Sequence, residues 1–266
     1  MNDQALLRVL AGIRDANYHR PGIRCLRLFR TADADTLERL LADVSLLRIG
    51  QRPSMAAAPG HVTAWTQPQG RVEQFSLLNA SGRSDDFSRD HDGSCFGKRF
   101  HHAKRLRALA ALTASLPHLV NFRVNVLGNG AALPPHEEHS VIRARDGAVG
   151  VRARFHLPLL THPAATLLLD GDLHHLEAGS VYLVNHGCVH AAENGGPHER
   201  IHLVWDMLLT AEACDVMFGQ GPVPHGFRRT HDVVRPVGRR LVRHWKRIAP
   251  QVLETDAGDV GFLEVQ

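Results

Sequence analysis

The stretch VRARFHLPLLTHPAATLLLDGDLHHLEAGSVYLVN, residues 151–185, carries most of the information about the fold. It holds three short runs rich in Leu, Val and Phe, and turns that contain Gly and Asp separate these runs. Two similar runs, NFRVNVLG (121–128) and ERIHLVWDMLL (199–209), lie on either side of it. Several short strands at this spacing are typical of a sandwich, a barrel or a jelly roll.

The segments outside this β-rich stretch favour helices, because their apolar residues recur at helical spacing and Asp residues offer N-caps. The expected elements are a helix over 4–16, a strand over 22–30, a helix that begins near Asp33 or Asp35, a helix over about 99–115 and a basic, helix-like segment over 235–247. The polar segment 81–97 is long enough for a functional lid.

These patterns predict a mainly β fold with flanking α-helices. The expected core is a double-stranded β-helix of the jelly-roll or cupin type, with N-terminal helices and a C-terminal helical extension. The predicted divisions are an N-terminal α+β region that packs on the core (1–117), the catalytic core (118–210) and a basic C-terminal extension (211–266).

Composition excludes several classes of protein. The 266 residues are 44% hydrophobic and 22% charged, which argues against disorder. No apolar run approaches the roughly 18 residues of a membrane span, and the N-terminus lacks a secretory apolar stretch, so we expect a cytoplasmic protein. The four cysteines form no Cys-x-x-Cys pair, which excludes a zinc ribbon and a thioredoxin-type motif. The net charge of +4 does not require a nucleic-acid partner, and we expect none.

Nineteen histidines are the compositional outlier and indicate metal chemistry. The densest group is LPPHEEH (133–139), where one residue separates His136 from Glu138. On an extended segment such residues point to the same side. With a distant histidine they make the two-histidine, one-carboxylate arrangement of non-haem iron(II) oxygenases.

The third ligand is expected on a later strand. The segment GSVYLVNHGCVHAAEN (179–194) resembles the second motif of cupins, and His190 is the expected ligand within it. A second His-x-Glu pair, His175 and Glu177, lies in a compact hairpin and is interpreted as structural. Ten residues after His190, Arg200 lies on a predicted inward-facing strand, where a buried guanidinium needs an anion.

In this order and spacing, PPHEEH, RFHLPL, AGSVYLVNHGCVHAAEN and ERIHLVWD resemble the aspartyl/asparaginyl β-hydroxylase family, which includes bacterial proline hydroxylases. The resemblance covers about residues 118–208. It implies that Fe(II) is bound by two histidines and that 2-oxoglutarate and O₂ are co-substrates. Most members have an aspartate, or no carboxylate, at the position of Glu138, so the third metal ligand is a departure from the family pattern.

Carried over by position, the resemblance implies that His136 and His190 bind the metal, and the His-x-Glu spacing adds Glu138 as the third expected ligand. The residues that the resemblance implies for the co-substrate or a substrate carboxylate are Arg200, Arg154, His156 and His202.

The sequence therefore predicts a 2-oxoglutarate- and Fe(II)-dependent dioxygenase that hydroxylates an unactivated C–H bond. Its substrate is expected to be an amino acid that is free, within a peptide or tethered to a carrier. The basic segment 235–247 could dock an acidic partner. Two alternatives remain open: a cupin-type metal enzyme with other chemistry, such as an isomerase, and a regulatory barrel with a basic tail that binds nucleic acid.

Overall fold

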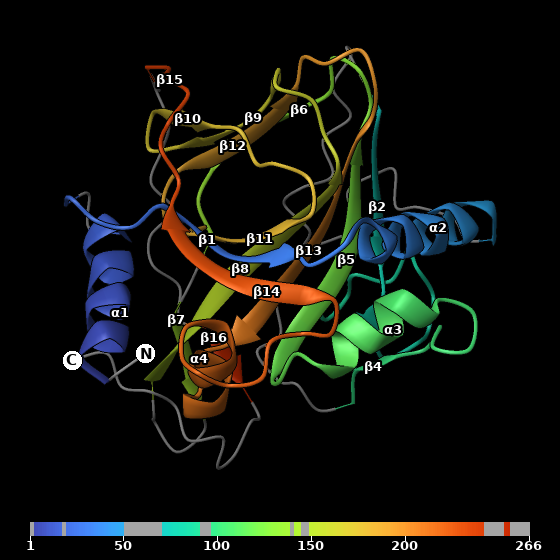
Figure 1. Ribbon diagram of the computed structural model, residues 1–266, viewed down its shortest axis with the longest axis horizontal. Helices are drawn as coiled ribbons and strands as arrows, with labels where there is room; N and C mark the ends of the chain where they lie inside the picture. The colour runs from blue at the N-terminus through green and yellow to red at the C-terminus, as the bar shows by residue number, and fades with distance from the viewer. Residues whose placement is uncertain are drawn as a thin grey trace.

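The computed structural model describes residues 3–17, 20–50, 71–90, 97–138, 141–144, 149–241 and 253–255. Two largely antiparallel sheets face each other (Figure 1). The order of strands in the larger sheet is β14-β1-β11-β8-β13-β5-β2, and in the smaller sheet it is β15-β10-β9-β12-β6. No helix in these described ranges has both the length and the apolar character that a membrane crossing requires.

The chain of the central region passes back and forth between the two sheets. The larger sheet contains β5 (Leu119–Leu127), β8 (Val149–Leu160), β11 (Ser180–Val184) and β13 (Arg200–Leu208). The smaller sheet contains β6 (Ala132–His136), β9 (Ala165–Leu169), β10 (Asp172–His174) and β12 (His190–Asn194). This winding is that of a double-stranded β-helix, so the predicted fold class is confirmed.

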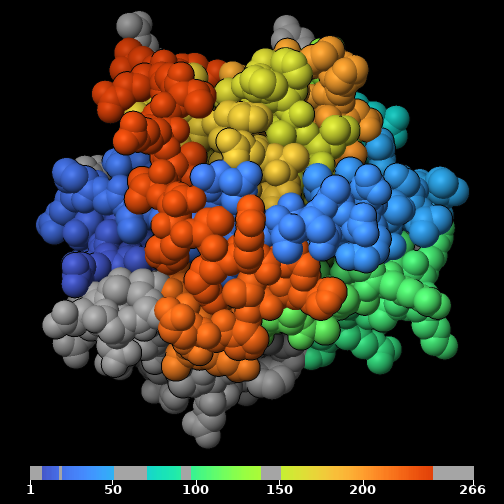
Figure 2. All heavy atoms as spheres, in the orientation of Figure 1, coloured from blue at the N-terminus to red at the C-terminus, as the bar shows by residue number. Residues whose placement is uncertain are grey.

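Strands from both ends of the chain extend these sheets. The flanking strands are β1 (Cys25–Thr31), β2 (Val72–Ser76) and β14 (Phe227–Val233) on the larger sheet and β15 (Gly238–Arg239) on the smaller one. Four short strands form further pairs: β3 (Leu78–Asn79) with β4 (Arg99–Phe100), and β7 (Val141–Ala144) with β8 and with β16 (Leu253–Thr255). In the space-filling view, N-terminal segments in blue lie on either side of the orange-red C-terminal residues (Figure 2).

The helices contribute to one apolar core together with the outer face of the larger sheet. They are α1 (Asp3–Asn17), α2 (Ala34–Gly50), α3 (Arg107–Ala114) and α4 (Ala211–Met217). Asp33 caps α2 as predicted, since its carboxylate accepts from the backbone N–H of Thr36 at 2.8 Å. Asp43 of α2 accepts from the N–H of Leu109 at 3.0 Å and so serves the first turn of α3.

Along each strand of the larger sheet, alternate side chains point to opposite faces. One set packs with the helices in the apolar core, and the other set points into the space between the two sheets. On β13, Leu203 and Trp205 belong to the apolar core, whereas Arg200, His202 and Asp206 occupy the other set of alternate positions. The same rule sends Phe155 and Leu157 of β8 to the core. The inner face of the larger sheet therefore carries buried polar groups, and this face meets the smaller sheet.

Two helical predictions need correction. The helix expected over 99–115 begins only at Arg107, because Arg99 and Phe100 pair with β3 instead. The helix expected over 235–247 is wrong for 235–241, where Gly238 and Arg239 pair with β10 and Arg239 contacts Asp172 at 2.9 Å. The remaining residues of that segment lie outside the described ranges.

The predicted lid over 81–97 is described only in part. Residues 81–90 are tied to the body of the protein, since Asp90 is buried and contacts Arg123 of β5 at 3.1 Å. Residues 91–96 lie outside the described ranges, and the lid and the three predicted divisions of the chain stay predictions.

Candidate metal centre

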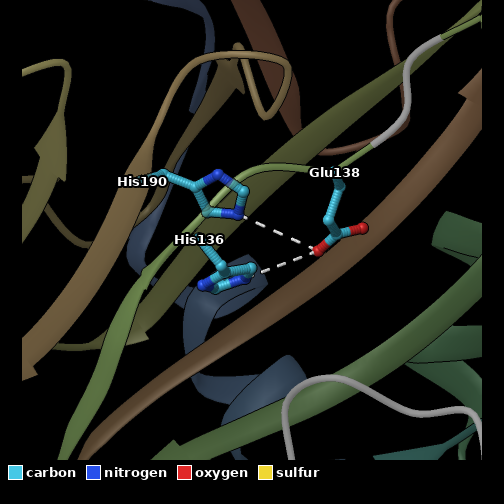
Figure 3. Close-up of side chains that lie close together, drawn as sticks. All are labelled: His136, Glu138 and His190. Carbon is cyan, nitrogen blue, oxygen red and sulfur yellow. Dashed lines mark ion pairs between the residues drawn. The ribbon is translucent and has the colours of Figure 1, made fainter. Parts of the chain in front are cut away.

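Two histidines of the smaller sheet and a glutamate just beyond it lie together between the sheets (Figure 3). His136 is the last residue of β6 and His190 the first of β12, and the strand pairing places them directly opposite each other. Glu138 follows β6, and its backbone N–H donates to the carbonyl of His186 at 3.1 Å. One ligand atom from each of the three side chains lies within 4.8 Å of the other two. Within the described ranges, no other group of three such side chains has this geometry.

Backbone carbonyls set the tautomers of both histidines. Nδ1 of His136 lies 2.8 Å from the carbonyl of Pro134, and Nδ1 of His190 lies 3.0 Å from that of Cys188. A carbonyl only accepts, so each Nδ1 carries the proton and each Nε2 presents a lone pair. Both Nε2 atoms lie 3.8 Å from Oε1 of Glu138. His190 Nε2 is buried without a hydrogen-bond partner among the described residues.

The charge states of these groups suit a cation. Burial raises the pKa of Glu138, but the guanidinium of Arg154 and the two histidines oppose it and hold that pKa well below its usual range. Burial and the neighbouring His136 lower the pKa of His190 to about 4, so its ring is neutral near pH 7. A carboxylate and two imidazole rings, each with its Nδ1 directed to a backbone carbonyl, therefore converge on one space. This donor set fits a divalent metal ion such as Fe(II).

Glu138 also joins a group of buried ion pairs. Arg154 holds both of its carboxylate oxygens, and Arg152 Nη2 contacts Oε2 at 3.3 Å. The other edge of Arg154 contacts Asp206 of β13, through Nε at 2.8 Å and Nη2 at 2.9 Å. These four side chains are at most 6% exposed.

A second feature of the interior is a buried arginine without an anion. Arg200 is 3% exposed, and among the described residues its guanidinium forms no ion pair with a carboxylate. Its Nη2 donates to Nδ1 of His202 at 2.9 Å, so the proton of this imidazole lies on Nε2. Nε2 of His202 is buried without a hydrogen-bond partner in the described part of the chain. Burial lowers the pKa of Arg200 to about 9.

His156 of β8 completes this second group. Its Nδ1 lies 3.3 Å from Nδ1 of His202. Burial and the charge of Arg200 lower the pKa of both histidines well below the usual range, so both rings are neutral. Among the described residues, the guanidinium of Arg200 has no carboxylate partner and Nε2 of His202 has no acceptor, and such a pair suits the carboxylate of a ligand.

All seven residues that the sequence singled out thus line the space between the two sheets. Three of them form the candidate metal cluster, Arg154 contacts that cluster through Glu138, and Arg200, His202 and His156 form the neighbouring group. His175 and Glu177 lie elsewhere, with the histidine bound to the carbonyl of Ala165 and the glutamate paired with Arg27.

Sequence reasoning missed Asp206 and Arg152. Both carried a signal, because each lies at even spacing from a residue that was predicted to face inward. Asp206 is four residues after His202 on β13, and Arg152 is two residues before Arg154 on β8.

A comparison with known protein families supports the family resemblance of the motifs. Residues 93–209 match the sequence model of the family described as Aspartyl/Asparaginyl beta-hydroxylase, which confirms the resemblance read from the motifs. No curated protein sequence matches the chain.

Several solved structures have a similar chain path at low sequence identity. A prolyl-4-hydroxylase from Pseudomonas putida is 16% identical, with a TM-score of 0.42, over 75% of this chain and 98% of the other. A 2OG-Fe(II) oxygenase family oxidoreductase from Burkholderia pseudomallei is 10% identical, with a TM-score of 0.43, over 77% and 91%. The non-haem α-ketoglutarate-dependent epimerase SnoN of nogalamycin biosynthesis is 15% identical, with a TM-score of 0.45, over 89% and 96%. At these scores the likeness describes the chain path alone.

Proposed function

On the family match over residues 93–209 and the cluster of His136, Glu138 and His190, we propose that this protein is an Fe(II)- and 2-oxoglutarate-dependent dioxygenase that hydroxylates an unactivated C–H bond. The observation that carries the proposal is the cluster of His136, Glu138 and His190 in the same interior as Arg200, a buried arginine that forms no ion pair with a carboxylate among the described residues. When bound, iron and 2-oxoglutarate would supply, with O₂ as the oxidant, the decarboxylation of 2-oxoglutarate to succinate and CO₂ that is coupled to hydroxylation of a substrate C–H bond.

The residues of the chain bind and orient these groups. His136, Glu138 and His190 would hold the metal through one atom each. Arg200 and the Nε2–H of His202 hold the far carboxylate of 2-oxoglutarate, and His156 lies beside them. Burial of these side chains keeps water away from the anion and strengthens its contact with Arg200.

The substrate in this proposal is an amino acid that is free, within a peptide or bound to a carrier, as the family resemblance implies. The described residues give no support to an acidic partner at 235–247. Arg239 pairs with Asp172 at 2.9 Å and Arg240 with Glu193 at 2.7 Å, so these two basic side chains already face carboxylates of the protein itself. The cytoplasmic location stays a prediction.

The proposal is tested with metal-free protein that is loaded with Fe(II) and 2-oxoglutarate without oxygen. We expect a weak metal-to-ligand charge-transfer band in the visible spectrum of the wild type. Arg200→Gln should weaken the band at a given 2-oxoglutarate concentration, and His190→Ala should abolish it. His118→Ala is the control, since this histidine pairs with Glu212 of α4 at 2.9 Å and lies outside the cluster, and it should keep the full band.

The result also separates the proposal from a cupin-type metal enzyme with other chemistry. Such an enzyme would bind the metal through His136 and His190 but would not need Arg200. A metal-loaded wild type with no band, or a band that Arg200→Gln leaves unchanged at every concentration, would contradict the dioxygenase.

A further inference from the structure

The contacts of Arg154 differ from those expected of a residue that binds a substrate anion. Its Nη1 and Nη2 hold the two oxygens of Glu138, and its Nε and Nη2 hold the two oxygens of Asp206. A guanidinium has five N–H groups, and these contacts use four of them. One arginine thus bridges the candidate metal ligand and a carboxylate of the neighbouring strand.

The charges around Arg154 are already balanced. Arg152 contacts the same two carboxylates, Asp206 at 2.8 Å and Glu138 at 3.3 Å. Arg123 lies 3.7 Å from Asp206 and pairs in turn with Asp90 at 3.1 Å. Three guanidinium groups therefore face three carboxylates, all within 6% exposure. A carboxylate of a substrate at Arg154 would place a fourth buried anion against this balanced group. Arg200, in contrast, is a buried cation that forms no ion pair with a carboxylate among the described residues.

Glu138 needs such support more than an aspartate would. A glutamate has one more rotatable bond, so an unsupported carboxylate samples more positions and loses more freedom when it binds a metal. Here Oε2 is held by Arg154 Nη2 at 2.7 Å and faces Arg152, while Oε1 lies toward both imidazole Nε2 atoms. The contact fixes the plane of the carboxylate and directs one oxygen to the place where the two histidine lone pairs meet.

We propose that Arg154 and Asp206 are positioning residues that orient Glu138 toward the metal, and that Arg154 is not the receptor of a substrate or co-substrate carboxylate. This inference rests on the proposed function, because it needs a metal at His136, Glu138 and His190. It gives Asp206 a part in orienting the metal ligand Glu138. It also replaces the expectation that Arg154 binds a carboxylate of the co-substrate or substrate.

The test is the affinity of the metal-free protein for Co(II), followed by the visible absorption of the bound ion. Asp206→Asn removes the negative charge that holds the far edge of Arg154, and we expect Co(II) binding to weaken about 10- to 100-fold. Glu73→Gln is the matched control. It removes another buried carboxylate, 7% exposed, that lies on β2 and pairs with Arg48 of α2 at 3.0 Å, and affinity should stay within about threefold of the wild type.

A second variant keeps the test decisive if Asp206→Asn does not fold. Arg154→Lys preserves the charge but loses the planar fork that reaches two carboxylates, so Co(II) should again bind more weakly. In a Glu138→Gln background, Arg154→Lys should cause little further loss, because the group that it orients is no longer a charged ligand. Binding of 2-oxoglutarate to the metal-free protein, measured by calorimetry, should persist in Arg154→Lys and be lost in Arg200→Gln.

Several results would overturn the inference. They are wild-type Co(II) affinity in Asp206→Asn, an equal loss in Glu73→Gln, and loss of 2-oxoglutarate binding in Arg154→Lys with metal binding intact. Failure of the proposed function looks different: the wild type itself would bind no Co(II), or would bind it equally well after His190→Ala.

Discussion

Replacement of Arg200 by methionine should stabilise the ligand-free protein and abolish its response to 2-oxoglutarate. Methionine has a similar length and no charge, so it removes the buried cation without a large cavity. A residue kept for ligand binding at the expense of stability is common at functional sites. If Arg200 instead stabilised the fold, its replacement by methionine would lower the free energy of unfolding.

The size of the effect follows from the burial of Arg200. Burial lowers the pKa of this group from its usual value to about 9. At about 1.4 kcal/mol per pKa unit, the charged form is destabilised by about 5 kcal/mol in the folded state. The substitution also leaves Nδ1 of His202 without its donor, which costs about 1–3 kcal/mol. The net gain is about 2–4 kcal/mol, or a rise in Tm of roughly 5–15 °C for a chain of this size.

The pH dependence has a definite sign. Because the folded-state pKa of Arg200 lies below its unfolded value, the destabilisation is fully present below pH 9 and diminishes as pH rises above 9. The difference in unfolding free energy between Arg200→Met and the wild type should therefore be constant from pH 7 to 8 and narrow at higher pH.

The assay is urea unfolding of the metal-free protein, with and without saturating 2-oxoglutarate. A ligand at about 100 times its Kd adds about 2.7 kcal/mol to the wild type, and this increment should vanish in Arg200→Met. Arg229→Met is the matched control, because Arg229 donates to three backbone carbonyls and its loss should destabilise the protein. The reasoning would be refuted by an Arg200→Met variant that is less stable than the wild type or that still responds to 2-oxoglutarate.

Three further predictions concern other parts of the fold. Both ring nitrogens of His174 are buried without hydrogen bonds among the described residues, and burial lowers the pKa of this histidine. The free energy of unfolding should therefore fall as pH drops below about 6.5, and His174→Leu should reduce that loss in urea unfolding at pH 5. Trp205 is fully buried between two phenylalanine rings, and Trp205→Ala should cost about 3–5 kcal/mol in the same assay; a cost below 1 kcal/mol would contradict the packing. Arg240 pairs with Glu193 at the surface, so Arg240→Ala should change stability by less than about 1 kcal/mol, and a larger loss would show that the pair is not solvent-screened.

Much of the fold could be predicted because strand alternation is a local property. The runs at 121–128, 151–160, 165–171, 180–185 and 199–209 all became strands of the two sheets. The helix over 99–115 was wrong in its first half because the pairing of Arg99 and Phe100 with β3 is a tertiary contact that overrides helical spacing. The same holds for 235–241, where a strand contact with β10 prevails over the basic, helix-like pattern.

The sequence by itself determined the fold class and the identity of the candidate ligands. His-x-Glu on an extended segment places both side chains on one face, and the order of the motifs carries the family resemblance. These features depend on neighbouring residues and on spacing along the chain.

Only the tertiary structure decided which charges are balanced. Arg154 and Arg200 look alike in the sequence, since each lies on an inward-facing strand beside a histidine at even spacing. In the folded protein, Arg154 lies between two carboxylates from different strands, whereas Arg200 faces none among the described residues. An ion pair depends on the distance between strands that are far apart in sequence, and the packing of the two sheets sets that distance.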